Sequence, residues 1–210
     1  MNRINEKEGI YAINKWTFFL IVCVVTFLLL FLKKNFVENE TTAFEILAER
    51  GQMGVFNFIN TLQYLSIPLL YIIKFGIIAF VIWTGCFMFG YRISFGDTWH
   101  VVVVSEIIFF IPELLKALWF IFIENNPTLF DIREFYPLSV VNLVDTEYLD
   151  ERWFYPFKAL NVFEIIYWFL LVEGIHSFAR KRKQIAYYII FSSYVLFFFL
   201  WLGFYVVVYK

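Results

Sequence analysis

The chain has 210 residues, of which 61% are hydrophobic and 23% aromatic. Ordinary soluble domains are roughly 45–50% apolar, so a soluble domain of this size could not bury so much apolar surface, whereas a bilayer solvates it. The 17 basic and 18 acidic residues nearly balance, which excludes the strongly basic character of a nucleic-acid-binding protein. Composition therefore indicates an integral membrane protein with membrane lipid, and no nucleic acid, among its partners.

Five apolar segments are long enough to cross the hydrocarbon, which takes about 20 residues. We interpret the first, Trp16–Leu32, as an uncleaved anchor, because it is longer than the apolar region of a signal peptide and no small-residue cleavage site follows it. The predicted spans cover residues 16–32, 67–91, 99–123, 157–178 and 185–209, with a segment 1–15 before them and loops 33–66 and 124–156 between them. The predicted fold class is all-α, a single domain of five transmembrane helices in a bundle.

The orientation of the bundle follows from a basic cluster in the short loop between the last two spans. This cytoplasmic basic cluster consists of Arg180, Lys181, Arg182 and Lys183. Basic residues in short loops stay on the cytoplasmic side, so the N-terminus is predicted inside and the C-terminus outside. The abundance of Ile, Phe, Lys, Asn and Tyr is typical of an AT-rich bacterial genome, so we expect a multi-pass protein of the bacterial inner membrane.

Both loops predicted to lie outside are acidic and have two interpretations each. Thr42-Ala43-Phe44-Glu45 fits a capping box that opens a short surface helix. That helix either docks a partner or leads the chain back into the bilayer. The loop 124–156, longer than a simple connection needs, is either a partner-binding surface or a cap over the bundle.

Ionisable residues inside the spans are the main candidate site, because each costs about 2.5–3.5 kcal/mol at the bilayer centre. Glu106 and Glu113 are seven residues apart and share a helix face, and Lys116 is close enough to pair with Glu113. Pro112 predicts a kink beside them. This arrangement is either a polar pocket or proton path, or a structural ion pair.

Two more charges complete the predicted intramembrane polar cluster. Lys74 lies in the second span and could pair with Glu106 or with Glu164 of the fourth span. Glu173, near the other end of the fourth span, is expected to pair locally with Arg180 or Lys181. The predicted cluster is Lys74, Glu106, Glu113, Lys116 and Glu164.

The sequence offers no catalytic, cofactor or metal motif. It has no Gly-rich phosphate loop, no His-Glu-x-x-His and no Gly-x-Ser-x-Gly, and its two cysteines, Cys23 and Cys86, lie in separate apolar runs. No aspartate lies within a predicted span. We therefore expect neither an enzyme nor a bound cofactor or metal.

Two phrases resemble the Yip family (Ypt-interacting proteins). The first runs from Ser94-Phe95-Gly96-Asp97-Thr98-Trp99 to Ile111-Pro112-Glu113-Leu114-Leu115, and the second from Leu160-Asn161-Val162-Phe163-Glu164 to Leu170-Leu171-Val172-Glu173-Gly174-Ile175. The resemblance covers about residues 65–209 and implies a five-helix membrane domain without known catalysis. It does not imply the Rab contacts of eukaryotic members, because the segment before the first span has only about 15 residues.

Three functions are compatible with this sequence. The first is a non-enzymatic scaffold or accessory subunit of an inner-membrane complex, contacting other membrane proteins through its helices or its acidic outer loop and possible as a homo-oligomer. The second is a small transporter or channel component that uses the charges in spans two to four. The third is lipid handling by the cytoplasmic basic cluster, which the topology signal alone also explains.

Overall fold

The computed structural model describes residues 13–34, 53–123, 129–144, 149–179 and 182–209. The protein is all-helical over this part of the chain, and its only β pairing there is an isolated bridge between Ser139 and Asn161. The helix predicted to begin at Thr42 lies outside the described residues.

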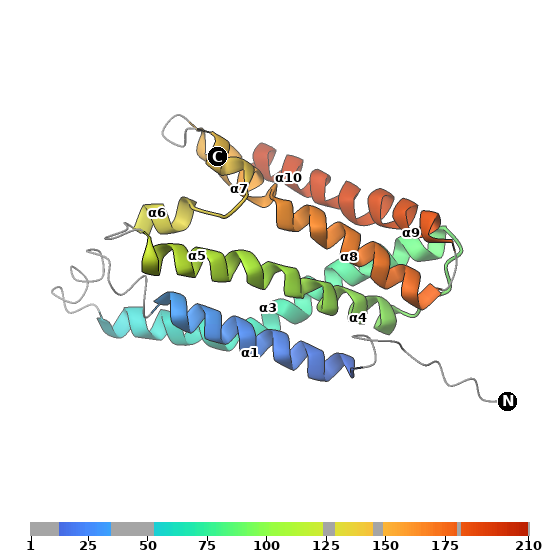
Figure 1. The fold of residues 1–210 in the computed structure, drawn as a ribbon, viewed down its shortest axis with the longest axis horizontal. Coiled ribbons are helices and arrows are strands. Elements are labelled where there is room, and N and C mark those ends of the chain that lie inside the picture. Colours follow the sequence, from blue (N-terminus) through green and yellow to red (C-terminus); the bar gives the residue numbers. More distant parts are fainter. Residues whose placement is uncertain (1–12, 35–52, 124–128, 145–148, 180–181, 210) are drawn as a thin grey trace.

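The described residues form five helical rods that run alternately in opposite directions (Figure 1). The rods are α1 (Lys15–Lys33), then α3 (Met53–Met88), then α4 (Phe95–Ser105) with the 3-10 turn η3 (Glu106–Phe109) and α5 (Phe110–Phe122), then α8 (Val162–Ala179), and last α9 (Lys183–Ile190) with the π turn η6 (Phe191–Val195) and α10 (Leu196–Val208). The connection between the third and fourth rods contains α6 (Leu129–Glu134), η4 (Val140–Leu143) and α7 (Glu151–Ala159).

Within the described part of the chain, three helices are long and apolar enough to cross a membrane. They are Lys15–Lys33, Thr61–Met88 and Lys183–Val208. A continuous apolar helix satisfies its backbone hydrogen bonds internally, as hydrocarbon requires. The length and apolarity of these helices support the assignment of the chain as a membrane protein.

The second and fourth rods begin elsewhere than predicted. Helix α3 starts at Met53, well before the predicted Ile67, because the apolar lead-in joins the same helix. The predicted fourth span starts at Phe157, but α7 ends at Ala159 and α8 begins only at Val162. Leu160 is extended, and the side-chain oxygen of Asn161 accepts the backbone N–H of Glu164 at 2.9 Å, which caps the new helix.

The third rod changes its winding beside Pro112. Proline lacks the N–H that would bond to the carbonyl four residues earlier, and that carbonyl belongs to Ile108, within η3. The 3-10 turn tightens the helix over Glu106–Phe109 before α5 resumes. The sequence predicted a kink near Pro112, and the observed turn places Glu106 at the change of winding.

The bundle has one end at Lys15 and the opposite end at Lys33, called here the Lys15 end and the Lys33 end. At the Lys15 end, Gly90 adopts φ 66°, and Tyr91 N–H donates to the Cys86 carbonyl at 2.8 Å, closing α3 with a Schellman turn. The Tyr91 hydroxyl donates to the Arg182 carbonyl at 3.0 Å, which joins the α3–α4 loop to the α8–α9 loop.

Most of the buried apolar core lies toward the Lys15 end, in what we call the closed half. It is formed by α4, the first part of α1, the second parts of α3 and α8, and the α9–η6 segment, and it includes Phe75, Ile82, Val102, Leu171 and Ile189. Gly85 of α3 is buried where a Cβ atom would lie 2.8 Å from Cβ of Ser193 in η6. The two backbones therefore pack closely.

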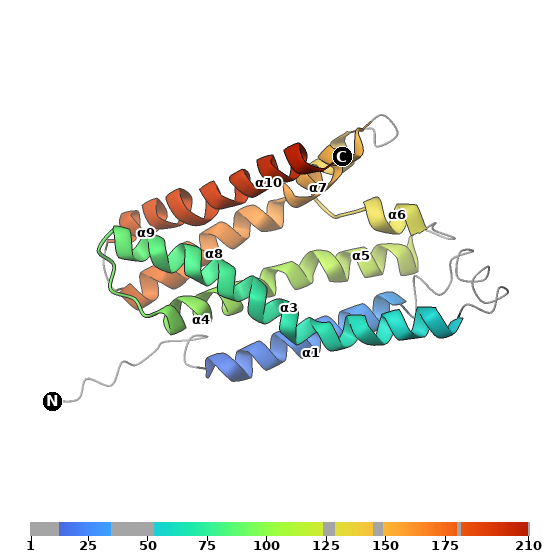
Figure 2. The same ribbon diagram turned by 180° about the vertical axis from the view of Figure 1, so that it is seen from behind.

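The half toward the Lys33 end, called here the open half, is packed differently. Its separate core cluster is small and consists of Phe120 and Ile132 with the partly buried Phe135. Figure 2 shows α3 crossing obliquely from beside α1 to the rod that contains α9. Helix α3 therefore packs beside α1 toward the Lys33 end and beside the rod that contains α9 toward the Lys15 end.

Candidate functional site

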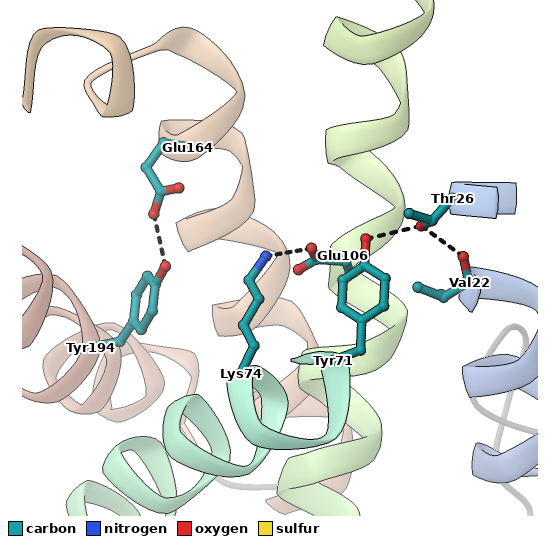
Figure 3. Close-up of polar contacts among 7 residues, drawn as sticks. All are labelled: Val22, Thr26, Tyr71, Lys74, Glu106, Glu164 and Tyr194. Atoms are coloured by element: carbon teal, nitrogen blue, oxygen red, sulfur yellow. Dashed lines mark hydrogen bonds and ion pairs between the residues drawn. The ribbon is translucent and has the colours of Figure 1, made fainter. Parts of the chain in front are cut away.

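A lysine and a glutamate form an ion pair in the middle of the bundle. Nζ of Lys74 on α3 lies 2.5 Å from Oε1 of Glu106 in η3 (Figure 3). Glu106 is only 2% exposed. The Lys74 side chain reaches into the bundle yet remains 46% exposed, because cavities flank it. Of the two partners considered from the sequence, the structure pairs Lys74 with Glu106.

Aromatic rings surround this ion pair. The ammonium of Lys74 lies 5.3 Å from the ring centre of Phe109 and 5.9 Å from those of Tyr71 and Phe75. Aromatic faces attract cations, more strongly when water is excluded. The rings therefore help to stabilise the ammonium of Lys74 inside the bundle, where aliphatic side chains alone would not stabilise it.

Several buried polar atoms beside the pair have no hydrogen-bond partner among the residues that the structure describes. They are Oε2 of Glu106, Oγ of Ser105 and the hydroxyl of Tyr167. Most buried polar atoms in folded proteins are hydrogen-bonded, and exceptions call for a ligand, a water molecule or a function. The centre of this bundle can therefore accept further hydrogen bonds.

A second carboxylate lies across the bundle from Glu106. Oε1 of Glu164 on α8 accepts from the Tyr194 hydroxyl at 2.8 Å (Figure 3). The same oxygen accepts from Nε1 of Trp168 at 2.9 Å. Two donors to one oxygen stabilise a buried carboxylate. Glu164 is therefore anchored to η6, while Lys74 projects between it and Glu106.

A hydroxyl pair connects α1 to this region. The Thr26 hydroxyl lies 2.9 Å from the Tyr71 hydroxyl and donates to the Val22 carbonyl, also at 2.9 Å (Figure 3). Tyr71 is one turn from Lys74 on α3. The first rod is thus tied by polar contacts to the rod that carries the lysine.

The first cavity of the open half lies between α1, α3 and α5 and has a volume of about 420 Å³. We call it the vestibule. Lys33 and Gln63 lie at its Lys33 end, Glu113 lines its wall, and Lys74 and Glu106 lie deeper. Polar side chains thus extend from the end of α1 to the buried ion pair.

A second cavity, of about 590 Å³, lies on the other side of Lys74, between α3, α7 and α10. We call it the aromatic cavity. Lys74, Phe109 and Tyr136 line both the vestibule and the aromatic cavity. Burial raises the pKa of Tyr136, and the nearby carboxylate of Glu113 adds to the effect. This tyrosine is therefore a neutral hydroxyl between the two spaces.

The five charges predicted to cluster do not all meet. Lys74, Glu106 and Glu113 line the vestibule, whereas Glu164 lines the aromatic cavity. Lys116 is 5% exposed and shares with Glu113 and Lys33 a void of only about 10 Å³. Pairing of Glu113 with Lys116 stays a prediction.

The cytoplasmic basic cluster is only partly described, since Arg180 and Lys181 lie outside the described residues. Lys183 forms an ion pair with Glu173 across the α8–α9 connection. The sequence predicted Arg180 or Lys181 as the partner of Glu173. The observed pair fits the start of α9 at Lys183, which faces the last turns of α8.

Sequence reasoning missed the aromatic and hydroxyl partners of the charges, chiefly Tyr71, Tyr136, Trp168 and Tyr194. The chain has 13 tyrosines and 29 phenylalanines, so no single ring stands out without the fold. Among the described residues, no group of three histidines, cysteines or acids is placed to hold a metal ion.

Comparisons of the chain with protein-family models, with curated proteins and with solved structures found no match. The function is therefore inferred from the residues and cavities of the site itself.

Proposed function

We propose that this chain is a non-enzymatic, five-span membrane protein that binds a polar or charged small molecule in the vestibule, as the ligand-binding component of a small transport system. The observation that carries the proposal is the Lys74–Glu106 ion pair at the foot of a cavity of about 420 Å³ that leads toward the Lys33 end.

Charged side chains are costly inside a bilayer. An ionisable residue in a membrane span is stable only if it faces a partner, a ligand or water, and such residues commonly mark binding sites. Glu106 has one buried oxygen without a partner, and Glu113 is exposed at the vestibule wall. These groups favour a site that accepts a polar molecule.

The packing of the bundle determines from which side the vestibule can be entered. The apolar core of the closed half lies beyond the ion pair, toward the Lys15 end. The vestibule is therefore entered from the Lys33 side, and this arrangement suits a one-sided binding site better than an open channel.

Five spans with the N-terminus inside are part of the same proposal. Alternating rods support them, as do Arg92 in the α3–α4 loop and Arg182 and Lys183 in the α8–α9 connection, all at the Lys15 end. The vestibule then faces outward, away from the cytoplasm of a bacterial cell. Membership of a Yip-like family, suggested by the phrases at 94–115 and 160–175, accommodates this topology.

The scaffold hypothesis from the sequence ranks second. A scaffold does not require charged side chains around an internal cavity, whereas a ligand-binding protein does. The acidic loop and the lipid-facing helices could still hold this protein beside a partner, so the two roles are compatible.

Thiol labelling tests the vestibule. In a background with Cys23→Ala and Cys86→Ala, Ser66→Cys places a thiol on the vestibule wall, and Val103→Cys places a control thiol in the closed half. A membrane-impermeant maleimide applied to intact cells should label Ser66→Cys and spare Val103→Cys. Arg92→Cys, at the Lys15 end, should react only in inverted vesicles.

Two results would contradict the proposal. One is labelling of Ser66→Cys only from the side that labels Arg92→Cys. The other is equal labelling of Ser66→Cys and Val103→Cys, which would mean that the two halves do not differ in access to water.

A further inference from the structure

We propose that the aromatic cavity is a binding site for an anionic lipid, with its headgroup at Lys158 and its hydrocarbon chains between α3 and α10. This goes beyond the vestibule and its water-soluble ligand, and it depends only on the bundle being in a bilayer.

The deep walls of the aromatic cavity are apolar and open toward the membrane. Ile77 on α3 is 50% exposed and Trp201 on α10 is 47% exposed, and both line the cavity with Phe197 and Phe198. Free water in a space of about 590 Å³ with such walls is unfavourable. Hydrocarbon that enters sideways from the bilayer fits these walls.

The rim of the same cavity is polar and cationic. Lys158, at the end of α7, lines it with Tyr136 and Tyr155. The Lys158 ammonium lies 5.8 Å from the ring centre of Tyr136. The Tyr155 oxygen accepts a weak hydrogen bond from Nε1 of Trp201 at 3.4 Å, so its own hydrogen can be donated. An ammonium and two phenol hydroxyls are donors that suit a phosphate oxygen.

The deeper wall does not favour an anion. Glu164 there is a carboxylate that accepts from Tyr194 and Trp168, and Lys74 forms an ion pair with Glu106. The headgroup is therefore placed at the rim, beside Lys158, rather than deeper. An anionic lipid fits this arrangement, with its headgroup at the rim and its hydrocarbon chains below.

Helix α7 has the composition of a membrane-interface helix. It carries Trp153 and Tyr155, both exposed, and its last turn contains Lys158. Tryptophan and tyrosine concentrate at the headgroup level, and lysine extends its ammonium to that level while its stem lies along apolar surface. Lys158 is therefore at the depth where a headgroup lies.

The groove on the other side of Asn161 and Glu164 provides an internal comparison. It has about 640 Å³ and is lined by Leu138, Leu143, Ile165 and Phe199, with no lysine or arginine among its described lining residues. It can take a hydrocarbon chain but cannot select a headgroup by charge. Unlike this groove, the aromatic cavity combines apolar walls with a cationic rim.

The test uses the purified full chain, delipidated and incubated with phosphatidylglycerol, phosphatidylcholine or inorganic phosphate, with bound lipid counted by native mass spectrometry. We expect phosphatidylglycerol to be retained at least about fivefold more than phosphatidylcholine, which corresponds to about 1 kcal/mol for one lysine near an anionic lipid. Lys158→Gln should remove this preference and Lys158→Arg should keep it.

Two further variants separate the cavity from nonspecific charge effects. Lys183→Gln removes a cation that pairs with Glu173 at the Lys15 end, and the lipid preference should not change. Ala159→Phe fills the aromatic cavity, which Ala159 lines, and should reduce retention of both lipids. Thermal unfolding of each variant checks that it is folded.

The proposal is overturned if the wild type retains both lipids equally, or if Lys158→Gln retains phosphatidylglycerol as the wild type does. It is also overturned if inorganic phosphate displaces the bound phosphatidylglycerol, because the site would then recognise a free anion. These outcomes do not depend on labelling of Ser66→Cys, so failure of the lipid site and failure of the vestibule can be told apart.

Discussion

The closed half and the open half of this bundle use the same aromatic-rich sequence in two ways. In the closed half, apolar side chains from all five rods interlock, with Val101, Val102 and Val103 fully buried on consecutive positions of α4. In the open half the helices carry Lys74, Glu106 and Glu164, and cavities of about 420 and 590 Å³ separate them.

The two halves differ because different kinds of side chain pack inside them. Small residues such as Gly85 allow close approach of helices, and close approach leaves no void. Charged side chains need partners and space, and at membrane depth they are retained mainly where they serve a function. The closed half thus stabilises the fold through close packing, while the open half holds charged side chains beside cavities.

The largest expected effect comes from breaking the Lys74–Glu106 ion pair. Lys74→Met leaves the buried carboxylate of Glu106 uncompensated and should lower the free energy of unfolding by about 3–5 kcal/mol. Glu106→Met leaves the ammonium of Lys74, which is 46% exposed, and should cost less. The double variant removes both charges and should recover most of that loss. Unfolding in mixed micelles with increasing dodecyl sulfate measures each value, and strict additivity of the two single losses would mean that the pair is not coupled.

A smaller loss is expected at the second carboxylate. Glu164→Leu leaves the buried Tyr194 hydroxyl and Nε1 of Trp168 without their acceptor, which should cost about 1–3 kcal/mol. Glu164→Gln keeps an acceptor oxygen and should cost less. The same unfolding assay compares the two, and an equal loss in both would show that the charge, not the hydrogen bonds, stabilises this position.

The close packing of the closed half can be tested with one methyl group. Gly85→Ala places a Cβ atom 2.8 Å from Cβ of Ser193 and should cost about 1–2 kcal/mol through overpacking. Gly203→Ala on α10 meets nothing within 4 Å and should be neutral or slightly stabilising, because alanine favours helix. If both changes behave alike in thermal unfolding, the contrast between the halves is wrong.

The smallest expected effect concerns the surface of α7. Hydrogen bonds from the Arg152 side chain and backbone hold the pKa of Asp150 below its usual range. A carboxyl with a lowered pKa contributes stability at neutral pH that is lost as the pH falls below about 4, through its folded-state pKa. The melting temperature of the wild type should therefore fall slightly in acid. Asp150→Asn keeps a cap for α7 but has no carboxyl to protonate, so its melting temperature should fall less. An unchanged acid profile would show that the contact does not stabilise the fold.

Much of the fold could be predicted from hydrophobic length alone. The runs at 16–32 and 185–209 coincide with continuous helices, since a long apolar run has only helical solutions in hydrocarbon. The break at Leu160 and Asn161 could not be predicted, because it depends on a side-chain cap and on backbone pairing of Ser139 with Asn161. Local apolarity gives no signal for either.

The candidate site was predictable in kind but not in its partners. Lys74, Glu106 and Glu164 could be selected because charges in apolar runs are rare and costly. The choice of Glu106 over Glu164 as the partner of Lys74 depends on the 3-10 turn and on Tyr194 and Trp168, which already occupy Glu164. Which ring lies beside which charge is a property of the packed bundle, not of any sequence window.

The hydrogen bond from Tyr91 to the Arg182 carbonyl has a mechanical consequence. It fastens the two connecting loops at one end of the molecule, so a tilt of the α8–α10 pair relative to α1 and α5 would pivot there. For a given rotation, displacement grows with distance from the pivot. Such a tilt would widen or narrow the cavities of the open half and would change the packed core of the closed half, next to the pivot, much less.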